Sequence, residues 1–204
     1  MLRGRWGAAD AAQGRTLALL LDAATGQVCW TGEGSDCPPV ELVGAAHLAE
    51  AGGKGQLIAP GLVDLHVHGA AGYDFADGTS EAFAGIAAYH ARCGTTALCA
   101  TILASSPEAT LRAIEVGREH LRGAAGEGAR VAGLHLEGPF LAPERAGAQP
   151  PEHLRLPDPV LLDEFLAAAR GSLRMVTLAP ELPGALALVE RLVDAGVLVS
   201  MGHS

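Results

Sequence analysis

Residues 60–69 read PGLVDLHVHG and combine a short apolar strand with two histidines at its end. Side chains two apart on a strand point to the same side, so His66 and His68 project together. Gly69 lets the chain turn directly after them and leaves room for a ligand. Two imidazoles at the carboxyl end of a strand form half of a metal site. The alternative is a pair of histidines that are hydrogen-bonded on a polar strand face.

The sequence after this strand alternates apolar, strand-like segments with helical ones. The strand-like segments span residues 62–67, 95–102, 131–137, 173–178 and 197–201. The helical segments span residues 80–93, 106–121, 160–170 and 183–195, with Ser80 and Ser106 as candidate N-caps. Strands that alternate with helices indicate parallel β-α-β units and therefore an α/β fold. A complete (β/α)8 barrel takes roughly 250 residues, so about five strands predict a partial (β/α)8 TIM-type barrel. An open α/β sheet is the alternative.

The beginning of the chain has a different pattern. Residues 1–14 read as a loose leader. Residues 16–22 and 27–31 predict a hairpin around an Ala-Thr-Gly turn. We therefore expect an N-terminal β segment over residues 1–57 and an incomplete barrel over residues 58–204.

Composition limits the class of protein. The chain has 204 residues and a net charge of -9, which fits one domain with a small appendage and disfavours a nucleic-acid partner. No apolar stretch reaches the roughly 18 residues of a membrane span, so we expect no membrane partner. Four cysteines show no CxxC spacing, which predicts reduced thiols and a cytoplasmic location.

Two more strand ends carry groups that could join the first two histidines. His135 and Glu137 end the third predicted strand, and His203 follows the fifth. Alone, Glu137 reads better as a solvated loop residue, and His203 as an ordinary histidine. His135 lies deeper in its strand and reads as a core residue or one that orients its neighbours. Because parallel strands end at one edge of a sheet, the shared position of His66, His68, Glu137 and His203 predicts a divalent metal site.

With these motifs, the chain resembles the amidohydrolase superfamily, and within it the N-acetylglucosamine-6-phosphate deacetylase family. The resemblance covers about residues 56–204, and LEGPF followed by TLAPE is more specific than the two histidines. The matching segments are APGLVDLHVHG (59–69), GTTALCATI (94–102), GLHLEGPFLAPERAGAQ (133–149), VTLAPE (176–181) and SMGHS (200–204).

The resemblance implies a set of metal ligands. Glu137 and His203 look like ligands of one ion. His66 and His68 match positions that bind a second ion in some members and are replaced in others. The implied cofactor is therefore one or two divalent ions, with zinc preferred.

The resemblance also implies substrate contacts. Ala148 and Gln149 fall where the family contacts its sugar. Many members have histidine at the position of Gln149, and a glutamine can hydrogen-bond there without carrying the same charge. The family's catalytic Asp lies on a later strand, so we expect no catalytic residue in this chain, which would be an N-terminal fragment. Residues 1–57 would belong to the small β-sandwich of the family.

The implied reaction is hydrolysis of the acetamide of N-acetylglucosamine 6-phosphate to glucosamine 6-phosphate and acetate. The alternatives are an amidohydrolase that acts on cyclic amides, a non-catalytic fragment, and an α/β binding module that contains histidines by chance. The expected partner is a small sugar phosphate. The exposed apolar edges of an incomplete barrel predict self-association, for example as a homodimer.

Overall fold

The computed structural model describes residues 2–6, 17–21, 28–33, 57–58, 61–123 and 128–204. The chain divides into two compact units, residues 1–60 and residues 61–204. Every candidate site residue belongs to the second unit.

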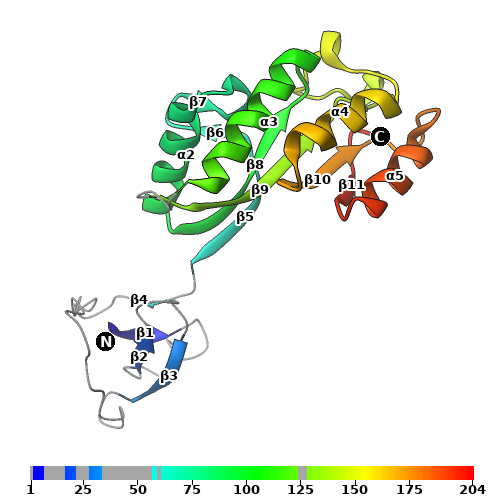
Figure 1. The fold of residues 1–204 in the computed structure, drawn as a ribbon. Coiled ribbons are helices and arrows are strands. Elements are labelled where there is room, and N and C mark those ends of the chain that lie inside the picture. The colour runs from blue at the N-terminus through cyan, green and yellow to red at the C-terminus, as the bar shows by residue number, and fades with distance from the viewer. Residues whose placement is uncertain (1, 7–16, 22–27, 34–56, 59–60, 124–127) are drawn as a thin grey trace. The chain divides into compact units, whose positions relative to one another are not determined.

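The first unit holds a four-stranded sheet in the order β3-β2-β1-β4 (Figure 1). β2 (Leu17–Leu21) and β3 (Val28–Glu33) pair antiparallel, which confirms the predicted hairpin. β1 (Leu2–Trp6) pairs antiparallel with β2 and parallel with β4 (Leu57–Ile58). The prediction of a loose leader is wrong for β1, whose backbone pairs with β2 although two arginines lower its apolar content. The other leader residues lie outside the described part of the chain.

The second unit is built on a five-stranded parallel sheet in the order β11-β10-β9-β8-β5. The strands are β5 (Leu62–Val67), β8 (Thr95–Leu103), β9 (Arg130–Glu137), β10 (Leu173–Leu178) and β11 (Leu198–Met201). The helices between them are α2 (Ser80–Arg92), α3 (Pro107–Arg122), α4 (Pro159–Ala169) and α5 (Ala185–Asp194). Figure 1 shows these helices along one side of the sheet. Neighbouring strands follow one another in sequence with a helix between each pair, as in half of a β/α barrel. The predicted α/β fold with about five strands is confirmed.

Local sequence determines where the helices begin. The Thr79 side chain accepts a hydrogen bond from the Ala82 amide, so Thr79 and not Ser80 caps α2. Ser106 caps α3 as predicted, and Pro107 takes the first helical position, where no amide partner is needed. The helices therefore start directly after the loops that follow the strand ends, and these loops form one rim with the carboxyl edge of the sheet.

The segment between β5 and α2, residues 69–79, has structure of its own. β6 (Gly69–Ala70) and β7 (Tyr73–Asp74) form a short antiparallel pair, and a 3-10 helix covers Phe75–Asp77. The Phe75 side chain is fully buried, and the Phe75 amide donates to the His68 carbonyl. The chain that follows the two predicted site histidines is therefore anchored in the core.

Aliphatic residues and phenylalanines fill the core between the sheet and its helices. Phe83 of α2, Ile114 of α3, Leu134 of β9 and Leu188 of α5 are all fully buried. Side chains of this size each gain about 1.5–3 kcal/mol from burial, before the loss of conformational entropy is counted. The rigid layer that results fixes where the strand ends, and hence the site residues, lie.

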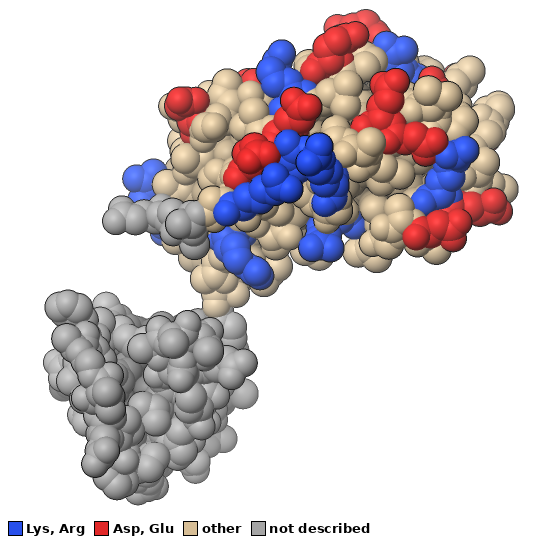
Figure 2. All heavy atoms as spheres, viewed as in Figure 1, with Lys and Arg blue, Asp and Glu red and all other residues tan. Residues whose placement is uncertain are grey.

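The surface of the second unit mixes charges of both signs. Acidic and basic side chains are interspersed over the face in Figure 2, in keeping with the net charge of -9 for the whole chain. Among the described residues, no helix is long and apolar enough to cross a membrane.

Candidate metal centre

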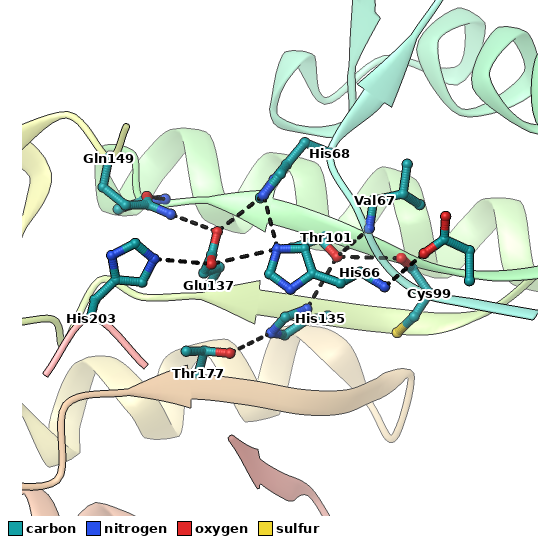
Figure 3. A network of polar contacts seen from close by, with 12 residues as sticks. His66, Val67, His68, Cys99, Thr101, His135, Glu137, Gln149, Thr177 and His203 are labelled. Carbon is teal, nitrogen blue, oxygen red and sulfur yellow. Dashed lines mark hydrogen bonds and ion pairs between the residues drawn. The ribbon is translucent and has the colours of Figure 1, made fainter. Parts of the chain in front are cut away.

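Three segments that are far apart in the sequence meet at the carboxyl edge of the parallel sheet. His66 and His68 come from the end of β5, Glu137 ends β9, and His203 follows β11. Figure 3 shows their side chains pointing toward the Glu137 carboxylate. His66, His68 and Glu137 each offer one ligand atom, and these atoms all lie within 4.8 Å of one another. The structure therefore brings together the four side chains that the sequence predicts as ligands.

The Glu137 carboxylate is the centre of this cluster, and Glu137 is only 7% exposed. Its Oε1 lies 3.1 Å from His203 Nε2 and 3.5 Å from His66 Nε2. Its Oε2 lies 3.0 Å from His68 Nε2, and the Nε2 atoms of His66 and His68 are 3.1 Å apart. Ligands bound tetrahedrally to zinc at about 2.0–2.1 Å are separated by about 3.3 Å. The spacing of the nitrogen and oxygen atoms therefore fits a shared ion.

The partners of His203 determine which ring nitrogen offers a lone pair. His203 Nδ1 lies 2.8 Å from the Arg145 carbonyl oxygen, and a carbonyl can only accept, so Nδ1 carries the proton. In the neutral ring, Nε2 then presents a lone pair to the Glu137 carboxylate, which is itself an acceptor. Two acceptors at 3.1 Å repel each other unless a cation or a proton lies between them. A divalent cation would satisfy both atoms, so this donor set fits a metal ion.

The Glu137 carboxyl group is held in its ionised form. Burial alone would raise the pKa of Glu137, but when the histidine rings are protonated, hydrogen bonds from His68 and His203 and the charges of His66 and His68 outweigh it and lower the pKa to about 2. The same hydrogen bond to Glu137 raises the pKa of His68. Among the described residues, Glu137 is also the only buried acidic side chain. A deprotonated carboxylate is the form that binds a metal.

The two histidines on β5 have fewer partners than His203. The His66 side chain is 46% exposed, and its backbone amide donates to the Asp64 carboxylate at 3.1 Å. His68 Nδ1 is buried, and the described residues offer it no hydrogen-bond partner. Metal-binding histidines usually donate their second ring N–H to an acceptor, which fixes the orientation of the ring. The rings on β5 lack this restraint.

The two residues predicted to contact the sugar differ in exposure. Ala148 is exposed on the loop that follows β9. Gln149 is only 3% exposed. Its amide oxygen accepts from the Ala104 backbone amide at 2.9 Å, and its amide nitrogen donates to Glu137 Oε2 at 2.7 Å. Gln149 therefore reaches the site through Glu137, and a sugar contact of either residue remains a prediction.

A buried polar network lies next to the His66 ring (Figure 3). His135 is fully buried, as expected of a core histidine, and its ring centroid is 5.0 Å from that of His66. Its Nδ1 lies 3.1 Å from the Thr101 hydroxyl, and its Nε2 lies 2.8 Å from the Thr177 hydroxyl. Thr101 also accepts from the Val67 amide at 3.1 Å, where the ladder between β5 and β8 is irregular. The Thr101 side chain therefore holds the backbone between the two site histidines.

Two residues of this network, Thr101 and Thr177, are not predicted from the sequence. Thr101 registers with His135 across β8 and β9, and Thr177 registers with Glu137 across β10 and β9. Both threonines lie in the matching segments quoted above, near the carboxyl ends of their strands. Their position on the site face depends on the register between strands, which a single sequence does not specify.

Comparisons with known proteins name one family repeatedly, although no protein-family model matches the chain. N-acetylglucosamine-6-phosphate deacetylase of Lysinibacillus sphaericus is 33% identical over 175 residues, which cover 86% of this chain and 45% of that protein. The crystal structure of N-acetyl-D-glucosamine-6-phosphate deacetylase from Mycobacterium smegmatis matches with a TM-score of 0.75 and 36% identity, over 93% of this chain and 49% of that one. A mutant from the same organism, in complex with N-acetyl-D-glucosamine-6-phosphate, matches with a TM-score of 0.70 and 35% identity, over 87% of this chain and 43% of that one.

These matches agree in sequence and in fold, and they confirm the resemblance inferred from the motifs. The chain spans less than half the length of each of these relatives.

Proposed function

We propose that this chain, which is related in sequence and fold to the N-acetylglucosamine-6-phosphate deacetylases, supplies the metal-binding part of a deacetylase active site. The reaction would be hydrolysis of the acetamide of N-acetylglucosamine 6-phosphate to glucosamine 6-phosphate and acetate. The observation that carries this proposal is the Glu137 carboxylate facing the lone pair of His203 Nε2 at 3.1 Å. A cation between these two atoms would satisfy both, at the carboxyl edge of the sheet, where β/α enzymes place their chemistry.

Glu137 and His203 would hold one divalent ion, and His66 and His68 would complete the same site or hold a second ion. We infer zinc, because imidazole and carboxylate ligands both suit it. When bound, such an ion lowers the pKa of a bound water from 15.7 toward about 7 and polarises a carbonyl oxygen.

The chain's own residues orient these groups. The Arg145 carbonyl keeps Nε2 of His203 turned toward Glu137. His135 is bonded at both ring nitrogens inside the core, so it would not exchange a proton with substrate. In the hydrolysis, the water oxygen bonds to the acetyl carbon, the C–N bond breaks, and a proton passes to the amine nitrogen. We infer that an Asp, expected from the family resemblance on a later strand, would move that proton.

The substrate is inferred from a relative. One structure from Mycobacterium smegmatis holds N-acetyl-D-glucosamine-6-phosphate. We infer the same class of sugar phosphate for this chain, with the exposed Ala148 beside the sugar and Gln149 close behind it.

The test is turnover by the purified chain in the presence of zinc. Release of glucosamine 6-phosphate and acetate would be measured with N-acetylglucosamine 6-phosphate as substrate, beside hydantoin and dihydrouracil as cyclic amides. The Glu137→Gln variant is the control, because it keeps the shape of the side chain and removes the charge. The expected result is zinc binding by wild type that is lost in this variant, and any turnover by wild type should be deacetylation alone.

The other outcomes identify the alternatives. Hydrolysis of the cyclic amides would favour a different amidohydrolase. Zinc binding without turnover of any substrate is the result expected of the metal-binding part alone, without the Asp that would move the proton. Absence of zinc binding would favour an α/β binding module.

We also infer a cytoplasmic location, pairing along the edge strand β5, and a small β-sandwich at the start of the chain. The free thiols of Cys93 and Cys99 suit a reducing cytoplasm. The exposed apolar side chains Leu62, Val63 and Leu65 on the edge strand β5 suit pairing, either in a closed TIM barrel or in a homodimer. The sheet of the first unit would form part of a small β-sandwich over residues 1–57.

A further inference from the structure

Gln149 is bonded at both ends of its side-chain amide, and both partners belong to the protein. The Ala104 backbone amide can only donate, so it holds the amide oxygen of Gln149 on its side. The NH2 group is thereby turned toward Glu137 Oε2, at 2.7 Å. Because Gln149 is 3% exposed, water does not compete for these bonds. Glu137 Oε2 receives a donor that carries no charge.

The loop that carries Gln149 also holds His203. We call residues 142–149 the bracket loop. The Ala142 amide donates to the His203 carbonyl at 3.0 Å, and the Arg145 carbonyl accepts from the His203 ring at 2.8 Å. One loop therefore contacts Glu137 through a side chain and His203 through its backbone. The bracket loop therefore contacts both Glu137 and His203, the two residues proposed to share the metal ion.

We propose that Gln149 is a positioning residue that fixes the Glu137 carboxylate by holding Oε2, so that Oε1 points at the ion shared with His203. This inference rests on the proposed metal centre. The terminal torsion of a glutamate side chain is broad and roughly two-fold, so an unbraced carboxylate samples many orientations. A donor on Oε2 removes that freedom before the metal arrives. Outer partners of metal ligands typically change metal affinity or activity by about 10–100-fold when they are removed.

The direct test is zinc affinity, measured on the whole chain by competition with a chromophoric chelator. Gln149→Met keeps the length of the side chain and removes both hydrogen bonds, and we expect zinc to bind about 10–100-fold more weakly. Gln149→His retains one donor and one acceptor and should recover most of the affinity. Glu144→Gln is the matched control, because Glu144 is exposed on the same loop, and it should leave the affinity unchanged.

A second measurement does not depend on the folding of Gln149→Met. The chain contains four glutamines and no asparagine, so its nitrogen-proton spectrum shows only four side-chain NH2 pairs. We expect one pair to exchange slowly with solvent and to shift when zinc is added. That pair should be absent from Gln149→His.

The outcomes distinguish a failure of the positioning role of Gln149 from a failure of the proposed metal centre. If wild type binds no zinc, the metal centre itself fails. If wild type binds zinc, two results would overturn the positioning role alone: Gln149→Met binding zinc within twofold of wild type, or no NH2 pair responding to zinc. Should Gln149→Met not fold, the NH2 spectrum of wild type decides.

Discussion

The two sides of the candidate metal centre are held in different ways. On the loop side, Glu137 is braced by Gln149, and His203 is braced by the Arg145 carbonyl. On the β5 side, the His66 side chain is 46% exposed and His68 Nδ1 is buried without a partner among the described residues. Glu137 extends from the central strand β9, whereas β5 is an edge strand.

This difference shows how one fold can hold ligands with unequal precision. A ligand whose remaining polar atoms are bonded loses little freedom when it binds a metal, whereas an unbraced ring must be ordered at that moment. We therefore expect Glu137 and His203 on the loop side to contribute most of the metal affinity, and His66 and His68 on the β5 side to contribute less. Five variants test this difference between the two sides.

The largest effect is expected from Glu137→Gln. The variant removes the one charge around which three imidazoles gather, so zinc should bind more than about 100-fold more weakly. Chelator competition measures the loss. Glu181→Gln is the matched control, because Glu181 is exposed just after β10 and should bind zinc like wild type. If Glu137→Gln bound zinc as tightly as wild type, Glu137 would not be a metal ligand.

A smaller effect separates the two sides directly. His203→Ala should weaken zinc binding by about 100-fold, and His68→Ala by only about 10-fold, because the ring of His203 is already oriented. Both variants would be titrated in the same chelator assay. Equal losses, or a larger loss in His68→Ala, would contradict the asymmetry.

The β5 side should also respond to a change in the buried network. Thr101→Val leaves the buried Val67 amide without its acceptor, which should cost about 1–3 kcal/mol in the free energy of unfolding. Urea denaturation without metal measures this loss, and zinc affinity should fall as the two histidines lose their alignment. Thr96→Val, at an exposed position on the same strand, removes only an exposed 3.4 Å hydrogen bond to the Leu62 carbonyl and should change the stability by less than about 0.5 kcal/mol. Equal stability of the two variants would show that Thr101 does not hold β5.

The smallest effect is expected from Asp64→Ala. Asp64 accepts from the His66 amide, but the contact is exposed and water can replace it. Zinc affinity should change by less than about threefold, that is, less than about 0.7 kcal/mol. A tenfold loss would show that β5 is held more firmly than its exposure suggests.

Much of the fold follows from apolar runs alone. β5 and β10 begin and end at the predicted residues, because each is a short apolar segment between turn residues. β1 escaped prediction because its arginines mask a strand that depends on pairing with β2. The pair β6 and β7 escaped because strands of two residues carry no periodic pattern.

The part of the candidate site that was predictable from the sequence is the set of side chains at the carboxyl ends of the strands. Parallel strands end at the same edge of a sheet, and this rule predicted that Glu137 and His203 lie close together although they are far apart in the sequence. The braces around them were not predictable in this way. The Ala104 amide and the Arg145 carbonyl are backbone groups, and the side of the strand on which Thr101 lies depends on register.

The metal centre requires that His66, His68, Glu137 and His203 bind a divalent cation. Binding can be measured by equilibrium dialysis of the purified chain against zinc, followed by metal analysis. One or two zinc ions per chain should remain bound after unbound metal is removed. A chain that is folded and retains no stoichiometric zinc would contradict it.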